Sequence, residues 1–282
     1  MQQMILAPLR GVTIRCFRET FAEELSEAGF TEAVTPFISA MPGVDPLKDR
    51  ELSAGPERGE LKITPQLIGK DPDALRVCLI KIKAAGYDTA DLNCGCPFPM
   101  VRNKGRGSGI LKTPDVLRRM LETGCEVMGE GRFSMKARLG VDSPDELRRL
   151  LPLITVFPLR FLTVHGRIAR QMYEGECDLA AVLAVAKECA VPVVANGDLD
   201  WRGGAGMVGR SFIRHLGTRD DAGELLAAYI EASRSELHGE CPVLGRMKEL
   251  VAYWKDLPRW KRRWQTVKIA RSLCELKQAA GV

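Results

Sequence analysis

Histidine is scarce in this chain: three of the 282 residues are histidines, at positions 165, 215 and 238. No two of them stand at a spacing that would let them share a metal ion on one helix or strand. This pattern excludes a zinc site of the usual kind, and we expect no bound metal.

Long apolar runs are also missing. A membrane-spanning helix needs about 20 consecutive apolar residues, and the richest stretch, residues 179–195, is interrupted by Lys187 and Glu188. The first residues lack the basic start, apolar centre and small-residue cleavage site of a secretory signal. We therefore expect a cytoplasmic protein with no membrane contact.

The nine cysteines show none of the regular spacing that a disulfide framework would require. Their number is odd and they are scattered from Cys16 to Cys274, which is typical of reduced thiols inside the cell. Disorder of the whole chain is excluded as well, because 45% of the residues are hydrophobic and can build a packed core.

The positive charge of the chain is concentrated in its last part. The net charge is +5, yet residues 239–282 hold ten Lys and Arg against four Asp and Glu, so residues 1–238 sum to −1. We expect two domains with their boundary there: a catalytic domain over 1–238 and a basic helical domain over 239–282. The basic domain favours a polyanionic partner; the alternative is a solvated helical face.

Short segments rich in Val, Ile, Leu and Thr alternate with amphipathic ones over most of the length, as in buried parallel sheets. The alternation predicts an α/β fold, a (β/α)8 TIM barrel with a C-terminal helical domain; a doubly wound open sheet is the alternative. The expected strands are residues 4–8, 33–37, 63–68, 89–93, 133–138, 161–165, 191–196 and 206–209. The expected helices are residues 13–28, 72–85, 114–124, 144–153 and 179–189.

The seventh unit of this barrel is too short. Only about seven residues, 199–205, separate the motif Asn196-Gly197-Asp198 from the last strand, whereas a crossover with its helix takes at least about 10–12. The seventh barrel helix is therefore expected to be missing. A plain loop would expose Val193 or Val208, unless another element covers them.

Polar side chains stand at the ends of six of the eight strands, where reacting groups lie in such barrels. Cys96 follows the fourth strand and opens a glycine-rich loop, so it can present a thiol to a ligand; burial as a small apolar residue is the alternative, and suits Cys94 better. Lys136 and Arg138 share one strand face and need an anionic partner such as a phosphate or an electron-rich ring.

The residues at these strand ends resemble one known family. The runs LAPLRGVT (6–13), PQLIG (65–69), DLNCGCP (91–97), KARLG (136–140), TVHGR (163–167) and VANGD (194–198) occur in the order and spacing of the tRNA-dihydrouridine synthases. The likeness spans residues 4 to about 215. The tail around Arg246 and Lys248 resembles, more loosely, the helical domain of the subfamily that acts on uridine 16.

The resemblance implies reduction of a tRNA uridine to 5,6-dihydrouridine with FMN and NADPH, hydride reaching C6 and Cys96 giving the proton to C5. It assigns FMN contacts to Ala7, Pro8, Gln66, Asn93, Lys136, His165, Arg167, Asn196, Gly197, Asp198, Gly209 and Arg210. Substrate contacts are expected from Asn93, Arg138, Arg246, Lys248, Arg262 and Arg263. Trp254, Trp260 and Trp264 could pack the tail helices or stack on bases.

Two other functions stay open. Residues 199–205 replace a helix that the family places between two parts of the FMN phosphate site, so the chain could be a tRNA-binding relative that has lost flavin. It could also be an FMN barrel oxidoreductase that acts on a small pyrimidine. We expect a monomer in each case.

Overall fold

Ten short strand segments lie side by side, all paired in parallel, in a computed structural model that describes residues 3–56 and 61–282. Their side chains are mostly buried, as expected for strands covered on both faces. The segments are β1 (Met4–Leu6), β2 (Glu32–Val34), β3 (Ile38–Ser39), β4 (Lys62–Thr64), β5 (Gln66–Ile68), β6 (Ala90–Cys94), β7 (Phe133–Gly140), β8 (Leu162–Ile168), β9 (Val193–Asn196) and β10 (Gly206–Val208).

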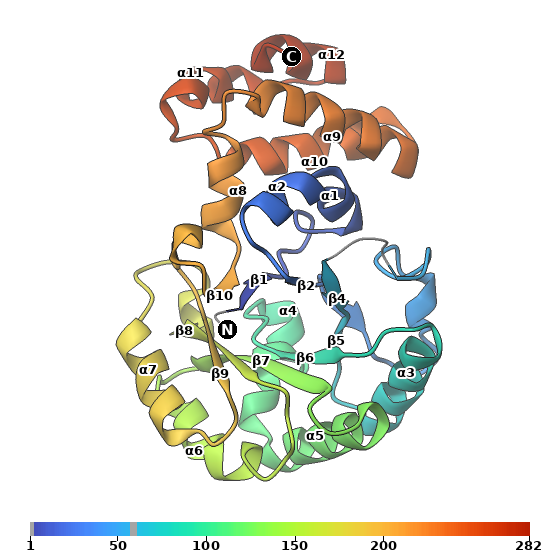
Figure 1. Cartoon of the computed structure of the whole chain (residues 1–282), viewed down its shortest axis with the longest axis vertical. Helices are drawn as coiled ribbons and strands as arrows, with labels where there is room; N and C mark the ends of the chain where they lie inside the picture. Colours follow the sequence, from blue (N-terminus) through green and yellow to red (C-terminus); the bar gives the residue numbers. More distant parts are fainter. Residues whose placement is uncertain (1–2, 57–60) are drawn as a thin grey trace.

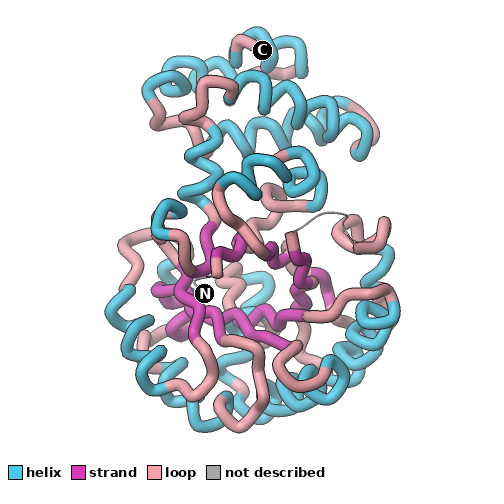
Figure 2. The backbone as a smooth tube through the Cα atoms, in the orientation of Figure 1, coloured by secondary structure: helices cyan, strands magenta, loops and turns pink. Residues whose placement is uncertain are grey.

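These segments form eight strands that close into a barrel. β2 and β3 are two parts of one strand, and β4 and β5 are two parts of the next, interrupted at Pro65, which has no N–H to donate. β2 pairs with β4 and β3 with β5, while β10 pairs with β1 and closes the ring (Figure 2). The predicted barrel is confirmed, and the open-sheet alternative is wrong.

Helices cover the outside of this ring (Figure 1). The Asp71 carboxylate accepts from the N–H groups of Asp73 and Ala74 and so starts the helix at Pro72. The barrel helices are α1 (Arg15–Thr20), α2 (Ala22–Glu27), α3 (Pro72–Ala84), α5 (Pro114–Met128), α6 (Glu146–Ile154) and α7 (Leu179–Glu188). Shorter turns are η1 (Pro46–Lys48), α4 (Pro99–Arg102), η2 (Gly107–Lys112) and η3 (Ala169–Gln171).

The seventh barrel helix is missing, as predicted. β9 and β10 are joined by a loop with one 3-10 turn, η4 (Trp201–Gly203). Val208 is fully buried all the same, because Leu199 and Trp201 pack against the same core. The loop therefore covers Val208, so the exposure considered for that residue does not occur, whereas Val193 is only half-buried.

The helices at the C-terminal end of the chain form a layer beside the barrel, at the top of Figure 1. It is reached through α8 (Arg210–Leu216) and consists of α9 (Ala222–Glu236), α10 (Glu240–Ala252), α11 (Pro258–Val267) and α12 (Leu273–Ala280). The ring centroid of Tyr229 lies 5.3 Å from that of Phe21 and 6.0 Å from that of Phe17. The layer thus shares one apolar core with α1 and α2.

Two tryptophans fasten the layer to α8. Trp254 and Trp260 are fully buried, with ring centroids 4.7 Å apart. Their indole N–H groups donate to the carbonyl oxygens of Ile213 at 2.7 Å and Gly217 at 2.9 Å. Both rings pack helices, so of the two roles considered for them, base stacking is excluded. Within the described ranges, no helix is long and apolar enough to cross a membrane.

Candidate functional site at the carboxyl end of the barrel

Most of the site residues expected from the sequence line one cavity at the carboxyl ends of the strands. Its enclosed part measures about 90 Å³. Gly197 and Arg210 also line a neighbouring open groove of about 990 Å³, which runs to the end of α10. The expected residues on the cavity wall are Ala7, Pro8, Asn93, Cys96, Lys136, Arg138, His165, Asn196, Gly197, Gly209 and Arg210.

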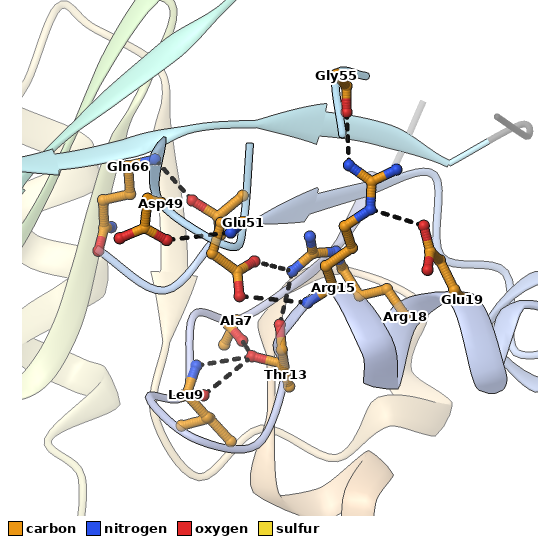
Figure 3. Close-up of polar contacts among 11 residues, drawn as sticks. Ala7, Leu9, Thr13, Arg15, Arg18, Glu19, Asp49, Glu51, Gly55 and Gln66 are labelled. Atoms are coloured by element: carbon orange, nitrogen blue, oxygen red, sulfur yellow. Dashed lines mark hydrogen bonds and ion pairs between the residues drawn. The ribbon is translucent and has the colours of Figure 1, made fainter. Parts of the chain in front are cut away.

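The loop after β1 forms one wall of the cavity and is held by Thr13 (Figure 3). The Thr13 hydroxyl donates to the carbonyl of Ala7 at 2.8 Å and accepts from the N–H of Leu9 at 2.8 Å. The buried Arg18 guanidinium donates to the Thr13 carbonyl at 2.8 Å and to the Glu51 carboxylate at 2.9 Å. These bonds fix Ala7 and Pro8 at the rim.

A buried chain of hydrogen bonds orients Asn93. Its amide donates to Gln66 at 2.7 Å, and the Gln66 amide donates to Asp91 at 2.8 Å. Ser134 donates to the other Asp91 oxygen at 2.6 Å. Burial raises the pKa of Asp91 to about 6, against the hydrogen bonds from Ser134 and Gln66, which lower it. Gln66 thus lies behind Asn93, and its role is to hold that side chain.

Cys96 is presented to the cavity by the backbone on either side of it. The side-chain oxygen Oδ1 of Asn93 accepts from the N–H of Gly95 at 3.1 Å and of Cys96 at 2.9 Å. The Ser108 hydroxyl donates to the Cys96 carbonyl at 2.9 Å. Gly107 has φ of +57°, and a Cβ there would lie 2.8 Å from that of Cys96, so only glycine fits.

The two cysteines of this segment differ in their surroundings. Cys94 is fully buried in the apolar core, and burial raises its pKa well above the usual value. Cys96 faces the cavity, and burial raises its pKa as well, against a backbone hydrogen bond that lowers it. A raised pKa keeps the Cys96 thiol protonated at neutral pH, so it can donate a proton and is a poor nucleophile.

Two buried cations extend from β7 to the cavity. Lys136 donates to the side-chain oxygen Oδ1 of Asn196 at 2.8 Å, and burial, together with nearby Arg138, lowers the pKa of Lys136 to about 8. Arg138 donates to the carbonyl oxygens of Gly95 at 3.0 Å and Ile168 at 3.1 Å. Burial lowers the pKa of Arg138 to about 10. Both charges are costly without a counterion, which favours an anionic ligand here.

His165 is neutral in this setting. Burial lowers its pKa far below the usual value, and Lys136, Arg138, Arg167 and Arg210 lower it further. The guanidinium of Arg167 lies 3.2 Å from His165 Nε2. Because a guanidinium only donates, Nε2 accepts, and the ring proton is on Nδ1.

Asp198 lies beside the cavity and pairs with two of these cations. It accepts from Arg167 and, at 2.6 Å, from Arg210. Although burial raises it, the pKa of Asp198 is lowered overall by the hydrogen bond and charge of Arg167 and the charge of Arg210. Arg167 also donates to the Cys177 sulfur at 2.9 Å. Asp198 therefore positions Arg210 at the junction of the cavity and the groove.

Several wall residues were not among the expected site residues, and Arg10, Phe98 and Tyr173 are three of them. The Arg138 guanidinium carbon lies 5.3 Å from the centroid of the Tyr173 ring, and that of Arg210 lies 5.7 Å from it. Arg10 and Phe98 also line the cavity. Phe98 could have been found, because it follows Cys96 by two residues; Tyr173 sits in a loop with no periodic pattern.

The structure does not bring the expected cations of the tail to this cavity. Arg246 pairs with Glu236 at 2.6 Å, and Lys248 donates to the carbonyl of Ala270 at 2.5 Å. Arg263 donates to the carbonyl of Ala280 at 2.5 Å, whereas Arg262 is exposed. Three of the four cations thus stabilise the helical layer itself.

Among residues 3–56 and 61–282, no three His, Cys, Asp or Glu side chains come together in a way that could hold a metal ion. The fold and the site therefore define a class: a parallel barrel with a cationic cavity at its carboxyl end, beside a protonated thiol.

Comparison with known proteins names the family within this class. A model of the dihydrouridine synthase (Dus) family matches residues 5–205, which is most of the barrel. The chain belongs to the dihydrouridine synthase family, and the resemblance found in the sequence is confirmed.

Curated relatives give the same result. The chain is 30% identical over 202 residues to tRNA-dihydrouridine synthase B of Vibrio vulnificus, covering 70% of this chain and 60% of that one. It is 31% identical over 224 residues to a probable tRNA-dihydrouridine synthase of Rhodobacter capsulatus, covering 73% and 66%. With tRNA-dihydrouridine(16) synthase of Salmonella typhimurium it shares 30% over 210 residues, covering 71% and 66%. The matched part thus spans 60% to 66% of these relatives.

Solved structures match at the level of the fold. An old yellow enzyme homologue from Zymomonas mobilis superposes with a TM-score of 0.52 at 14% identity, covering 75% of this chain and 85% of that one. A morphinone reductase variant in complex with tetrahydroNAD gives a TM-score of 0.50 at 12% identity, covering 75% and 84%. Both matches support the barrel architecture alone.

Proposed function

We propose that this protein reduces a uridine of tRNA to 5,6-dihydrouridine, with FMN as the bound cofactor and NADPH as the reductant. The family membership and the names of the relatives support the reaction and the substrate. Because tRNA is the proposed substrate, the cytoplasm is the proposed location. The position of the uridine is left to experiment.

The chemistry of the cavity fits FMN. Four cations surround His165, and Asp198 is the one carboxylate that pairs with any of them among the described residues, so positive charge is in excess. A phosphate would balance it near Gly197, Gly209 and Arg210, where a guanidinium can bond two oxygens. The enclosed 90 Å³ is below the roughly 300 Å³ of usual ligand pockets. The cofactor would therefore also occupy the adjoining groove or displace the exposed Tyr173.

When bound, FMN supplies hydride chemistry that no side chain of the chain can provide. The chain's own residues do the rest. Lys136 would hold the electron-rich part of the flavin ring, and Asn196 would keep the ammonium group in place at 2.8 Å. Arg210 would hold the phosphate, with its direction set by Asp198.

Cys96 is the proposed general acid. Saturating the C5–C6 bond of uracil requires a proton at C5 in addition to a hydride at C6. The Cys96 thiol holds its proton because its pKa is raised, and it faces the cavity. After donating the proton, the thiolate would be stabilised by the nearby charges of Arg138 and Arg10.

The uracil carbonyl oxygens need hydrogen-bond donors from the protein, because water is excluded from the site. Asn93, held by Gln66, and Arg138, held between two carbonyl groups, are the proposed donors. Neutral His165 offers its Nδ1–H without adding a further charge. Since the target base is stacked in folded tRNA, it would be extruded into the cavity.

The observation that carries this proposal is the meeting of a protonated Cys96 with Asn93, Lys136, Arg138 and His165 around one cavity. The test begins with the spectrum of the purified protein, which should show bound flavin. Unmodified tRNA transcripts are then incubated with NADPH or NADH, and dihydrouridine is located by reverse-transcription stops after alkaline treatment. RNA from cells with the gene should carry dihydrouridine at that position, and RNA from cells without the gene should lack it.

Each alternative has its own outcome in this experiment. A colourless protein that binds tRNA, and gains no flavin when FMN is added, would indicate a non-catalytic relative. A yellow protein that reduces free uridine or uracil and leaves tRNA unchanged would indicate a small-molecule oxidoreductase. Either result would overturn the proposal.

A further inference from the structure

The loop after Cys96 combines exposed apolar side chains with unbalanced positive charge. Residues 97–106, here called the cysteine loop, contain Arg102, Lys104 and Arg106 and no acidic residue. None of the three cations forms an ion pair with a described residue. Phe98 and Met100 of the same loop are 41% and 73% exposed.

We propose that the cysteine loop is a nucleotide platform, an inference that rests on the proposed function. Phe98 and Met100 stack against a base next to the extruded uridine. The adjoining phosphates are held by Arg102, Lys104 and Arg106. Aromatic side chains set in a cationic surface are what single-stranded nucleic acid binds. Phe98 touches the cavity wall, whereas Met100 lies outside it, so the platform leads out of the site.

The loop is rigid enough to serve as a platform. α4 is tied back by the N–H of Gly105, which donates to the Arg102 carbonyl at 2.9 Å, and by the bonds of Ser108 to Cys96. Arg106 reaches Met41 at 2.8 Å across the neighbouring loop. A fixed surface loses less conformational entropy when RNA binds, which raises the affinity for a given contact area.

The position of the loop selects nucleotides that flank the target. The platform begins two residues after the proposed proton donor, and α4 lies within the ring of strands in Figure 1. Extruding a uridine breaks its stacking with its neighbours, and an aromatic ring at the rim can replace the lost contact. Other exposed apolar residues, such as Val77 and Ile80 on α3, lie away from the cavity wall.

The charges of the tail belong to a separate surface, that of the helical layer. Arg246, Lys248 and Arg263 are used inside the helical layer. Lys255, Lys261, Arg262, Lys268 and Arg271 are exposed on that layer. The cations of the cysteine loop are also free of ion pairs among described residues, and they follow the reacting Cys96 by six to ten residues. The loop is therefore the better candidate for gripping RNA beside the site.

The test compares Phe98→Ala, Phe98→Tyr, Met100→Ala and Lys104→Gln with the control Val77→Ala, all in the full-length flavin-loaded protein. The probes are a short single-stranded RNA with 2-aminopurine next to a uridine, and a pool of unmodified tRNA transcripts. We expect Phe98→Ala to weaken binding of both about tenfold and to raise KM without a matching loss of kcat. Phe98→Tyr should restore binding to within about twofold, and Val77→Ala should change nothing.

Two further readouts decide the origin of the effect. 2-Aminopurine fluorescence should be quenched by the wild-type protein and less by Phe98→Ala, since quenching reports stacking. Lys104→Gln should reduce the slope of log affinity against log salt by about one. Met100 and Lys104 are exposed, so these variants will fold even if Phe98→Ala loses its flavin.

The failures of the two proposals differ. Wild-type turnover of tRNA with unchanged affinity and KM in Phe98→Ala, Met100→Ala and Lys104→Gln would overturn the platform and leave the proposed function intact. Loss of RNA binding in these variants of a protein that reduces no uridine would leave the platform and overturn the function. Binding of a protein ligand at this loop, with RNA affinity unchanged, would also overturn the platform.

Discussion

At the scale of single residues, burial decides what the ionisable groups around the cavity can do. The same desolvation keeps the thiol of Cys96 protonated, leaves His165 neutral and brings the pKa of Lys136 down to about 8. In water each of these groups would behave in its ordinary way. Burial in the barrel thus makes Cys96 a proton donor, His165 an uncharged hydrogen-bond donor, and Lys136 a cation whose pKa lies near neutral pH.

The first prediction separates Cys96 from Cys94. Cys96→Ala removes the proposed acid, so turnover should fall by about 10² to 10⁴ while flavin and RNA are still bound. Cys94→Ala removes only a buried sulfur, so the protein should keep its activity and lose about 1 kcal/mol of stability. Single-turnover reduction of a tRNA transcript checks both, and an exchange of the two phenotypes would move the acid to Cys94.

The second prediction concerns Asp91, whose pKa rises from 3.8 to about 6 in the fold. Because the folded state holds this proton more tightly than the unfolded state, Asp91 makes stability fall as pH rises from about 4 to 6, and the loss stays above that. The size is about 3 kcal/mol for a shift of about two pKa units.

Asp91→Asn should remove this part of the pH dependence. Its amide can still accept from Gln66 while Ser134 turns to accept, so the hydrogen-bond chain is kept. Urea unfolding at several pH values between 4 and 7 measures the effect. If the free energy of unfolding of the variant changed with pH as steeply as that of the wild type, the charged form of Asp91 would cost the folded state little free energy.

At the scale of elements, the seventh unit shows how a loop can stand in for a helix. Leu199 and Trp201 cover part of the outer face that a barrel helix usually covers, and Val193 and Ala195 stay half-buried. The Trp201 ring stacks on His215 at 4.4 Å and meets Phe212 at 6.3 Å, both on α8. A Cβ on Gly206 would lie 2.7 Å from the Leu199 side chain, so the loop sits tightly on β10.

The third prediction tests this cover. Trp201→Ala should lower the free energy of unfolding by about 2 kcal/mol, less than the 3–5 of a fully buried Trp because the ring is half exposed. Arg202→Ala, whose side chain is 74% exposed, is the matched control and should stay within about 0.5 kcal/mol. Flavin retention during dialysis should fall only in Trp201→Ala, because the loop starts at Asp198 beside Arg210. Equal stability of both variants would show that the loop covers nothing.

At the scale of the whole molecule, the helical layer is part of the folding unit and more than a detachable basic tail. Trp254 and Trp260 belong to the same apolar cluster as the barrel residues. Removing residues 239–282 would uncover α8 and α9, so loss of RNA binding in such a truncated protein could result from unfolding. Charge variants are therefore the sharper test of RNA contacts, and the boundary at residue 238 stays a prediction.

The fourth prediction measures the attachment of the layer. Trp254→Phe keeps most of the buried ring but leaves the Ile213 carbonyl without its donor, and should cost about 1–3 kcal/mol. Trp264→Phe, at a half-buried position, is the control and should cost less. Unfolding followed by both near-UV and far-UV circular dichroism should give one shared transition. Two separate transitions would show that layer and barrel unfold independently.

The sequence by itself determined the barrel and the residues at its carboxyl end. Parallel strands buried on both faces have a recognisable composition, and polar residues at their ends stand out against it. The short link after Asp198 was equally visible, because a helix needs a minimum number of residues. For these features the information is local in the chain.

Only the tertiary structure decided what distant residues do to one another. The Gln66 amide faces Asn93 and Asp91, and Tyr173 comes to lie beside Arg138 and Arg210, because the barrel brings these strands and loops together. Arg246, Lys248 and Arg263 of the tail turn inward because carbonyl groups and Glu236 lie within reach in the packed layer. Spacing along the chain records neither burial nor partners across it, and these set the pKa values and the free charges of the site.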